Sequence, residues 1–458
     1  MVLTNILLFF VDLLAILGGA VSDILLGKFK TIIAMSFVYI VGCTVLSASG
    51  IQALFSSART LCFISLLLIA LGTGGIKPNI SSFVGDQFDS RSAEALSSVF
   101  AVFYFLINAG SLCSTILTPI IRVRVSYAVA FGVPAILLLV ATVLFALGSR
   151  GYTKYHVPKG PSAFAVFYRV IRTAWTERKR SRESGEVFPP SATDSSPGAI
   201  TNENMQQTPF LDYAKPIMGD QIVEDVRCVL KVLLVFVPLP VFWSLYDQHA
   251  SKWVFMSQEL NTRIGKVNMP PELIQVLNPL LTLSMIPVFD RLIYPFFKNR
   301  GIFLHPLKHK MVAGMILTAL SFVVSGGLQL WMNHALPNKL SIFTMLPQFW
   351  ILSCAEVLVS ITGLEFAYSQ APKWLKSIVM SGWLFTTAVG NGFVAILALV
   401  KIGHRALEFF LYAALMILFT MIFYILVRGY QLVNTGATPS EEEKQAQPLL
   451  QEEETPAI

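Results

Sequence analysis

Long, nearly uninterrupted runs of apolar residues dominate this chain. A helix needs about 20 predominantly apolar residues to cross about 30 Å of hydrocarbon, and eleven stretches approach that length. Their approximate ranges are 5–25, 31–50, 61–83, 97–121, 127–148, 226–248, 272–296, 311–332, 344–368, 377–401 and 407–428. The pattern therefore predicts an all-α polytopic membrane protein.

The spans form a group of five and a group of six on either side of a polar interruption. We predict an N-terminal transmembrane bundle at 1–148, a linker at 149–225, a C-terminal transmembrane bundle at 226–430 and an acidic tail at 431–458. Within the linker, residues 162–176 have the pattern of an amphipathic helix lying on the membrane surface.

Composition agrees with a membrane protein. Of the 458 residues, 54% are hydrophobic and 13% are charged, whereas soluble domains have about 45–50% apolar and about 25% charged residues. This composition excludes secreted disulfide-stapled, disordered and nucleic-acid-binding classes, and it predicts the lipid bilayer as a partner. The five Cys residues are odd in number and form no C-x-x-C, so we expect neither a disulfide framework nor a metal site. We predict no enzyme activity and no cofactor.

Basic residues in the connections indicate the orientation. Lys and Arg are commoner in the connections on the linker side, although the excess is small when only short loops are counted. The positive-inside rule then places the linker and the C-terminal tail in the cytosol. The N-terminus would lie outside, and because it begins almost at the first apolar residue, we expect one more helix before it.

Six ionisable side chains fall within the apolar runs. A charge at the centre of a spanning helix costs at least about 2.5–3.5 kcal/mol, so such residues are functional candidates. A channel would more often repeat one kind of charge in a ring. Single charges of both signs on many helices suit a central polar cavity that binds a zwitterion and titrates protons, although structural pairing of individual residues stays open. The six residues are Asp12, Lys77, Lys231, Asp247, Asp290 and Glu356.

A glycine-rich run at 72–81 is the most informative segment. Its sequence, GTGGIKPNIS, continues an apolar stretch without a break, which argues against a loop. The glycines predict close approach of a neighbouring helix or a substrate, and Pro78 predicts a kink beside Lys77. Earlier in the chain, the spacing of Gly19, Asp23 and Gly27 predicts a gate hinge between two helices.

Several of these segments resemble the proton-coupled oligopeptide transporters, a branch of the major facilitator superfamily. GTGGIKPNISSFVGDQF and FYFLINAGSL resemble the two signature segments of that family. PLPVFWSLYDQHASKW, CAEVLVSITGLEFAYSQAP and SGWLFTTAVGN resemble its animal members in particular. The resemblance extends from about residue 8 to about residue 430 and is interrupted in the linker.

The resemblance implies a fold of two six-helix bundles with inverted repeats and a site near the bilayer midplane. This chain matches the second to twelfth helices of that fold. The first helix, which carries an E-x-x-E-R motif tied to proton coupling, has no counterpart, and neither does the large extracellular insert of the animal transporters. We therefore expect weak proton coupling, or none, from these 458 residues.

The resemblance also implies roles for individual residues. Lys77 would neutralise the peptide carboxylate, while Tyr104 and Asn108 would contact the peptide from one helix face. Asn278 and Glu356 would receive the peptide's amino terminus. The aromatic residues Trp243 and Trp383 would line side-chain pockets, with placement in an interfacial belt as the alternative for either one.

The same comparison gives gating or coupling residues. Lys231 and Asp290 match an arginine–aspartate pair proposed to latch the outer gate, with lysine keeping the charge but losing the bidentate geometry of arginine. Asp23 and Asp247 complete the predicted gating and coupling set. Asp12 matches no acidic residue of the family.

Three functional hypotheses follow. The first is proton-coupled symport of di- and tripeptides by alternating access, with the plasma membrane as the expected location. The second is an N-terminally truncated form of such a transporter that is inactive or regulatory. The third is a related facilitator for histidine or nitrate, and Glu356 with Asn278 favours an amine-bearing substrate over nitrate. The sequence does not indicate the oligomeric state.

Overall fold

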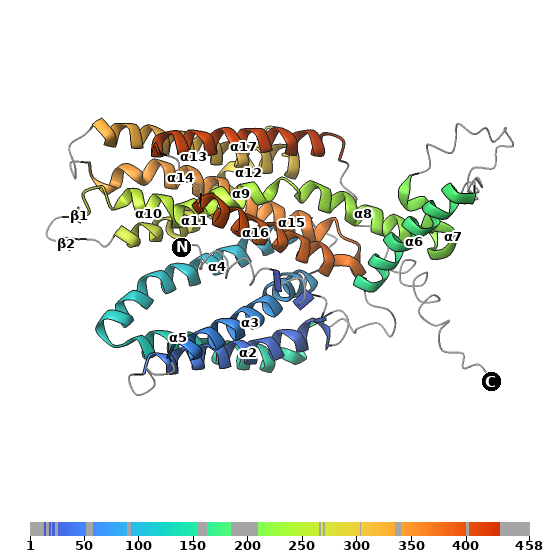
Figure 1. Ribbon diagram of the computed structural model, residues 1–458, viewed down its shortest axis with the longest axis horizontal. Coiled ribbons are helices and arrows are strands. Elements are labelled where there is room, and N and C mark those ends of the chain that lie inside the picture. Colours follow the sequence, from blue (N-terminus) through green and yellow to red (C-terminus); the bar gives the residue numbers. More distant parts are fainter. Residues whose placement is uncertain are drawn as a thin grey trace.

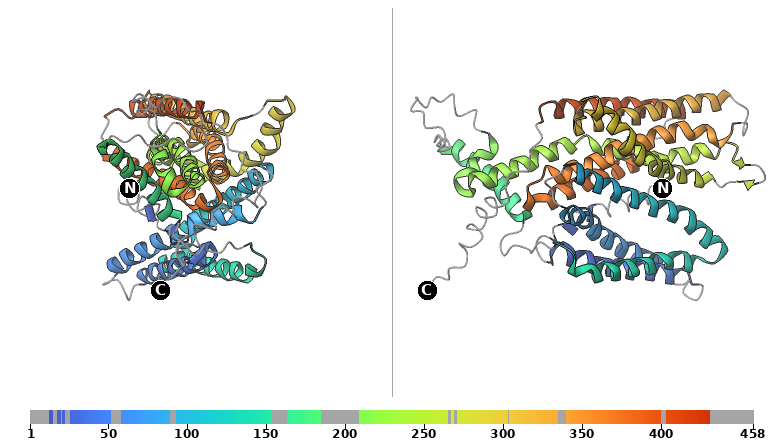
Figure 2. Two further views of the ribbon diagram at one scale, coloured as in Figure 1. Left: turned by 90° about the vertical axis from the view of Figure 1, so that its right-hand side faces the viewer. Right: turned by 180° about the vertical axis from the view of Figure 1, so that it is seen from behind.

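A computed structural model gives the fold. It describes residues 13–14, 18–19, 21–22, 26–51, 58–88, 93–153, 163–184, 209–264, 267–268, 271–302, 304–334, 340–399 and 403–430. Within these residues the regular secondary structure is helical except for one antiparallel pair of strands with two residues in each strand. Two helical bundles lie side by side, with the linker helices at one end of the molecule (Figures 1 and 2).

In the described part of the chain, four long helices form the N-terminal bundle, and a short 3₁₀ turn follows them. They are α2 (Gly27–Ser49), α3 (Ala58–Asp86), α4 (Ala93–Arg124), α5 (Tyr127–Leu147) and η3 (Gly148–Arg150). The close approach predicted for the glycine-rich run is confirmed in the contact between α2 and α3. A Cβ atom on Gly72 would lie 2.6 Å from the Tyr39 Cβ, and one on Gly75 would lie 2.3 Å from the Met35 Cγ. The helix α3 continues through Pro78, so the run is not a loop.

The linker contains α6 (Ala163–Ser184), η5 (Phe210–Ala214) and α7 (Lys215–Met218). The predicted amphipathic helix is present as α6. Its apolar face, however, packs on η5 and α8, and Val170 and Ala174 are fully buried in the main core. Protein therefore covers much of this face, whereas Tyr168 and Trp175 are each 65% exposed. Contact of α6 with the membrane surface stays a prediction.

The C-terminal bundle contains the remaining elements, which include short 3₁₀ and π segments between the helices. They are α8 (Asp220–Phe236), α9 (Leu239–Tyr246), η6 (Asp247–Ala250), α10 (Lys252–Ser257), β1 (Arg263–Ile264), β2 (Val267–Asn268), η7 (Pro271–Val276), α11 (Leu277–Val288), η8 (Phe289–Ile293), α12 (Tyr294–Asn299), η9 (Pro306–Met311), α13 (Val312–His334), η10 (Ile342–Met345), α14 (Leu346–Glu356), η11 (Val357–Ile361), α15 (Thr362–Ser369), η12 (Lys373–Leu375), α16 (Lys376–Leu399) and α17 (Arg405–Arg428).

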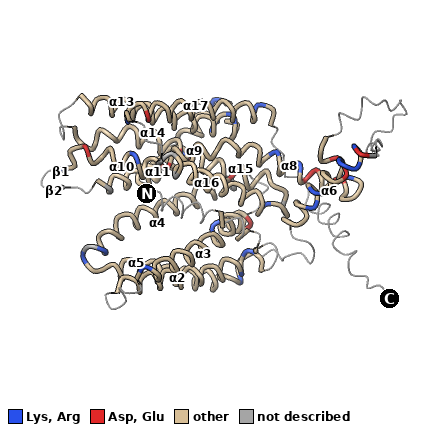
Figure 3. The backbone as a smooth tube through the Cα atoms, in the orientation of Figure 1, with Lys and Arg blue, Asp and Glu red and all other residues tan. Residues whose placement is uncertain are grey.

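Ten of the eleven predicted membrane spans are confirmed in the described part of the chain. Nine are single helices of sufficient length and apolar character, and the tenth is the bent pair formed by Asp220–Phe236 and Leu239–Ser257. The predicted span at 5–25 lies largely outside the described residues. Figure 3 shows few charged positions along the middle of the bundles and many around α6. The protein is therefore a multi-pass membrane protein.

The two bundles meet along α3 and α4. Helix α4 packs against α11 and α15, and α3 packs against α16. Any side chain that bonds across this contact joins the two bundles, so the interface is the place to look for a functional site.

An acid-base cluster fixes the linker to the start of α8. The Asp212 carboxylate pairs with Arg227 at 2.5 Å and with Lys215 at 3.0 Å. Burial alone would raise the pKa of Asp212, but bonding and positive charge from these two residues outweigh it and hold the pKa below its ordinary value of 3.8. Hydrogen bonding to Asp212 likewise raises the pKa of Lys215 above its ordinary value of 10.5.

These shifts predict a pH window for linker attachment. A lowered carboxyl pKa stabilises the folded form above the unfolded pKa, and the effect is lost as pH falls through the folded pKa. The raised lysine pKa gives stability that is lost as pH rises past 10.5. Hydrogen–deuterium exchange of residues 209–219, corrected for intrinsic rates, should therefore increase below pH 3.8. Asp212→Asn should abolish this acid response, whereas Asp220→Asn should retain it. An unchanged acid response in Asp212→Asn would contradict the assignment.

Candidate functional site

Glu356 is a buried carboxylate in the middle of a membrane span. It is the last residue of α14, its exposed fraction is 2%, and the π-helical segment η11 follows at once. Single π turns inside α-helices often occur at functional sites. Burying a carboxylate is unfavourable unless several donors satisfy it, so its bonding partners define the site.

Among the described residues, hydrogen-bond donors on α4 and α11 reach this carboxylate. The Tyr104 hydroxyl on α4 donates to Oε1 at 2.5 Å. On α11, Thr282 Oγ1 and Asn278 Nδ2 donate to Oε2 at 2.8 and 3.0 Å. Thr282 follows Asn278 by four residues, which places both on one helix face. The Tyr104–Glu356 bond joins the N-terminal bundle to the C-terminal bundle.

A second layer of polar contacts surrounds Asn278. Its Nδ2 also donates to the Tyr246 hydroxyl at 2.7 Å, and its Oδ1 accepts from Ser353 Oγ at 3.3 Å. We call Tyr104, Tyr246, Asn278, Thr282 and Glu356 the Glu356 cluster. Four elements contribute to it, namely α4, α9, α11 and α14.

Two tryptophans lie beside the Glu356 cluster. The Trp243 and Trp383 rings are 5.8 Å apart with an edge-to-face geometry, and the Tyr246 ring lies 5.9 Å from Trp243. Trp243 Nε1 donates to Thr386 Oγ1 at 3.0 Å. Both tryptophans are buried, so placement in an interfacial belt is wrong for either one.

The position of the Trp383 ring depends on a glycine in a neighbouring helix. A Cβ atom on Gly363 of α15 would lie 2.0 Å from the Trp383 Cη2. Overpacking of this kind typically costs about 1–3 kcal/mol. Gly363→Ala should therefore lower the melting temperature in detergent, and adding Trp383→Phe should restore part of the loss. The matched control is Gly327→Ala, where the added Cβ meets open space. Equal melting temperatures for the two alanine variants would contradict this packing argument.

A further set of contacts joins the bundles nearer the linker. Asp86 at the end of α3 pairs with Lys28 of α2 at 2.5 Å and accepts from the Tyr368 hydroxyl of α15 at 3.0 Å. The Lys376 ammonium lies 3.6 Å from the centre of the Tyr368 ring. We call Lys28, Asp86, Tyr368 and Lys376 the linker-side clamp. The clamp lies near the linker because the linker helix α6 packs against η12, the short segment between α15 and α16.

Lys77 and Asn108 do not bond to Glu356 in the described contacts. Lys77 lies on α3 with an exposed side chain. Asn108 is buried on α4, one turn beyond Tyr104, and its Nδ2 donates to the Tyr104 carbonyl at 3.0 Å. Asn108 therefore braces the helix turn that presents Tyr104, and Lys77 stays a candidate for a separate contact.

Comparison with known proteins identifies the family. A model described as the POT family matches residues 29–402. The human protein "Solute carrier family 15 member 2" is 38% identical over 358 residues, which cover 76% of this chain and 46% of the relative. The fly protein "Peptide transporter family 1" (Drosophila melanogaster) is 39% identical over 329 residues, which cover 70% of this chain and 41% of the relative.

The chain belongs to the POT family.

Solved structures agree with this assignment. The POT family transporter PepTSo is 32% identical with a TM-score of 0.71, and the match covers 94% of this chain and 89% of that one. An auto-inhibited POT family peptide transporter is 29% identical, also with a TM-score of 0.71, over 95% of this chain and 89% of that one. The predicted major facilitator fold is therefore confirmed. The chain spans less than half the length of the human and fly relatives.

The residues predicted to act in gating or coupling are less closely grouped in this POT-family chain. Lys231 on α8 and Asp290 in η8 are both exposed, and the described ion pairs include none between them. Lys231 lies twelve residues before Trp243, and Asp290 lies twelve residues after Asn278. Twelve residues correspond to roughly 18 Å along a helix. Both lie toward the linker, so a latch between them would belong to the linker side rather than to an outer gate. Asp247 is half-buried beside Tyr246, and Asp23 lies outside the described residues.

Sequence reasoning missed several residues of this POT-family site. Thr282 carried a usable signal, because it follows Asn278 by one helix turn. Tyr246, Tyr368 and Asp86 gave none, since a tyrosine within an apolar run and an acid at a helix end are both common. Their partners lie on other helices, and only the packing brings them together.

Proposed function

We propose that this protein transports di- and tripeptides together with protons by alternating access. The observation that carries the proposal is the Tyr104–Glu356 hydrogen bond, in which the buried acid of one bundle is held by a hydroxyl of the other. An acid in this position favours an amine-bearing substrate. The names of the human and fly relatives, a solute carrier and a peptide transporter, support transport as the activity.

The peptide ammonium is the proposed competitor of Tyr104. In a low-dielectric site, a carboxylate attracts an ammonium much more strongly than in water. The peptide ammonium would donate to Glu356 Oε1 in place of the Tyr104 hydroxyl. Asn278 and Thr282 would continue to donate to Oε2. Binding the substrate would thus break one bond between the bundles, which links occupancy to bundle movement.

A proton acts on the same carboxylate. Protonation removes the negative charge of Glu356 and weakens a hydrogen bond that depends on an ionised acceptor. We therefore propose that proton and ammonium are alternative partners of Glu356 and are loaded at different steps. Lys77 would receive the peptide carboxylate, and the wall formed by Trp243 and Trp383 would face the peptide side chains. This wall is apolar and non-directional, so it suits many sequences.

The linker-side clamp is the proposed inner gate. It holds α2 and α3 against α15 through a buried acid, and its release would open a route on that side. In the released state, the exposed Lys231 and Asp290 are free to pair as a second linker-side latch. We place the linker and the C-terminal tail in the cytosol, with the plasma membrane as the proposed location.

Transport by the full chain in liposomes tests the proposal. We expect saturable uptake of a labelled dipeptide and competition by unlabelled di- and tripeptides. Stimulation by an inward proton gradient should be weak, because these 458 residues contain no counterpart of the E-x-x-E-R motif. A single amino acid such as histidine should not compete. The absence of dipeptide-competed uptake would overturn the function, and uptake without any response to the gradient would overturn the coupling.

A further inference from the structure

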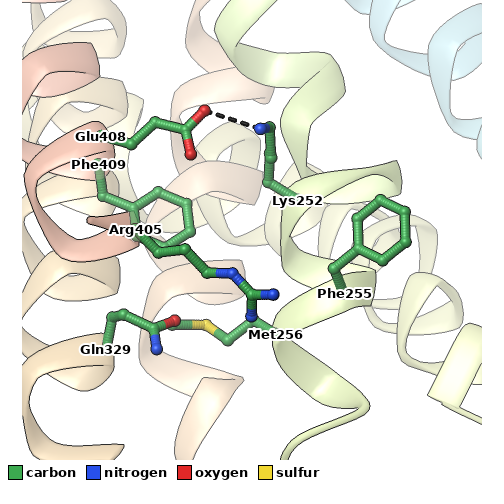
Figure 4. Close-up of a pocket in the computed structure, with 7 residues that line it drawn as sticks. All are labelled: Lys252, Phe255, Met256, Gln329, Arg405, Glu408 and Phe409. Atoms are coloured by element: carbon green, nitrogen blue, oxygen red, sulfur yellow. Dashed lines mark ion pairs between the residues drawn. The ribbon is translucent and has the colours of Figure 1, made fainter. Parts of the chain in front are cut away.

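A small pocket lies at the end of the C-terminal bundle opposite the linker. Its walls are α10, α13 and α17, and its volume is about 290 Å³ (Figure 4). Lys252 begins α10, Arg405 begins α17, and Gln329 lies near the end of α13, so all three walls reach the same membrane boundary. Helices α13 and α17 lie on the side of this bundle away from α2–α5 (Figures 1 and 2). The pocket is therefore separate from the inter-bundle site.

Charges of both signs surround the pocket. Lys252 Nζ pairs with Glu408 Oε1 at 2.7 Å, and the Tyr412 hydroxyl donates to the same oxygen at 2.5 Å. Arg405 forms an ion pair with Glu259. An ammonium has three donors and a guanidinium has five, so each cation keeps N–H groups beyond these pairs. Glu259 balances Arg405 from outside the pocket lining, and with it the four charges sum to zero, which matches a ligand with no net charge.

One hydrogen-bond acceptor that lines the pocket is buried and has no donor among the described residues. Gln329 is 3% exposed, and its Nε2 donates to Asn333 Oδ1 at 3.1 Å. Its Oε1 has no hydrogen-bond partner among the described residues. Figure 4 shows this oxygen directed toward Met256 in the pocket wall. A buried acceptor without a donor is unfavourable, so a ligand that brings an N–H group would complete the site.

The neighbouring surface is apolar. Leu330 and Trp331 on α13, and Leu407 and Leu411 on α17, are all exposed. In a bilayer, exposed apolar side chains on spanning helices contact acyl chains. The pocket thus lies at the depth of a lipid headgroup and beside the surface that the chains of that lipid would cover.

We propose that this pocket binds the headgroup of phosphatidylethanolamine. The phosphate would contact the remaining N–H groups of Lys252 and Arg405, and the primary ammonium would donate to Gln329 Oε1 and the Glu408 carboxylate. Phosphatidylcholine has the same net charge, but its quaternary amine has no N–H group. Phosphatidylglycerol carries a net negative charge, which the balanced charges do not favour. This inference does not depend on the proposed transport activity.

Native mass spectrometry of the full chain in detergent tests the proposal. Equal amounts of the three lipids with matched acyl chains would be added. Since a hydrogen bond to a charged group contributes about 1.5–3 kcal/mol and 1.4 kcal/mol is tenfold, we expect about tenfold more phosphatidylethanolamine than phosphatidylcholine bound. Gln329→Leu should bring this ratio close to one. Arg405→Gln changes an exposed side chain and should weaken retention of both lipids. The matched control is Arg428→Gln, at the other end of α17.

Other outcomes decide against the proposal. Equal retention of the two zwitterionic lipids by the unmodified chain would overturn it, and so would an unchanged preference in Gln329→Leu that still melts normally. Competition by free phosphoethanolamine distinguishes binding of the intact lipid from binding of the soluble headgroup. We expect millimolar concentrations to displace little bound lipid, because the acyl chains contribute contacts. Complete displacement would show that the soluble headgroup suffices and would overturn a lipid site.

Discussion

Replacing Glu356 by glutamine is expected to lower uptake of a free-amine dipeptide by about 10- to 100-fold. A hydrogen bond to a charged group contributes about 1.5–3 kcal/mol, and 1.4 kcal/mol corresponds to a factor of ten. With the amide oxygen in the Oε2 position, Thr282 and Asn278 keep their acceptor, and the amide nitrogen can donate to the Tyr104 hydroxyl oxygen, so the side chain keeps its place. What it removes is the negative charge that an ammonium requires. The measurement is initial uptake rate in liposomes at fixed pH.

A peptide with a blocked amine provides the control for Glu356→Gln. It lacks the ammonium, so its residual uptake should change much less. Thr282→Val removes one donor to the same carboxylate without removing its charge, and its effect should be smaller than that of the glutamine variant. Equal losses for the free and blocked peptides would mean that Glu356 supports coupling or folding rather than amine recognition.

Replacing Asp86 by asparagine is expected to open the linker side. Removing one partner of a buried ion pair destabilises the contact by about 3–5 kcal/mol, and the low end applies because the Lys28 side chain is 18% exposed. About 3 kcal/mol is a factor of more than 100 in the equilibrium between clamped and released forms. The Tyr368 bond to the same carboxylate weakens as well. Net peptide transport should fall, because the gate no longer closes against the gradient.

Cysteine labelling measures this opening. The Cys228 thiol on α8 is half-buried and donates to the Gln370 carbonyl, two residues beyond Tyr368. Its reaction with a small maleimide, followed by peptide mass spectrometry, should be at least about ten times faster in Asp86→Asn, in line with the shift in the clamp equilibrium. Lys179→Gln breaks an exposed pair with Glu183 and should leave the rate unchanged, because such pairs contribute little. An unchanged rate in Asp86→Asn would show that the clamp does not control access.

Continuous runs of apolar residues were sufficient to predict the spans, because a membrane helix requires such a run whatever its neighbours. The candidate residues were also accessible, since a lone charge such as Glu356 is conspicuous in apolar sequence. The contacts between helices could not be predicted from the sequence. Asn278 and Thr282 reach Glu356 only because α11 packs against α14, and Lys231 shows that a charge at depth does not identify its partner. The packing of α6 on η5 and α8 was also not predicted, because its pattern does not tell a protein surface from a lipid surface.

The span formed by α14, η11 and α15 carries the two hydrogen bonds to the N-terminal bundle described above. Glu356 and Tyr368 are twelve residues apart, or roughly 18 Å along the axis, and they bond to Tyr104 and Asp86 respectively. If the span moves as a rigid unit, a tilt that moves Glu356 away from α4 would also shift Tyr368 relative to α3. The π segment η11 lies between these two residues and sets their relative rotation about the axis. In the proposed transport cycle, the loading of Glu356 and the release of the linker-side clamp would therefore be coupled through this one span.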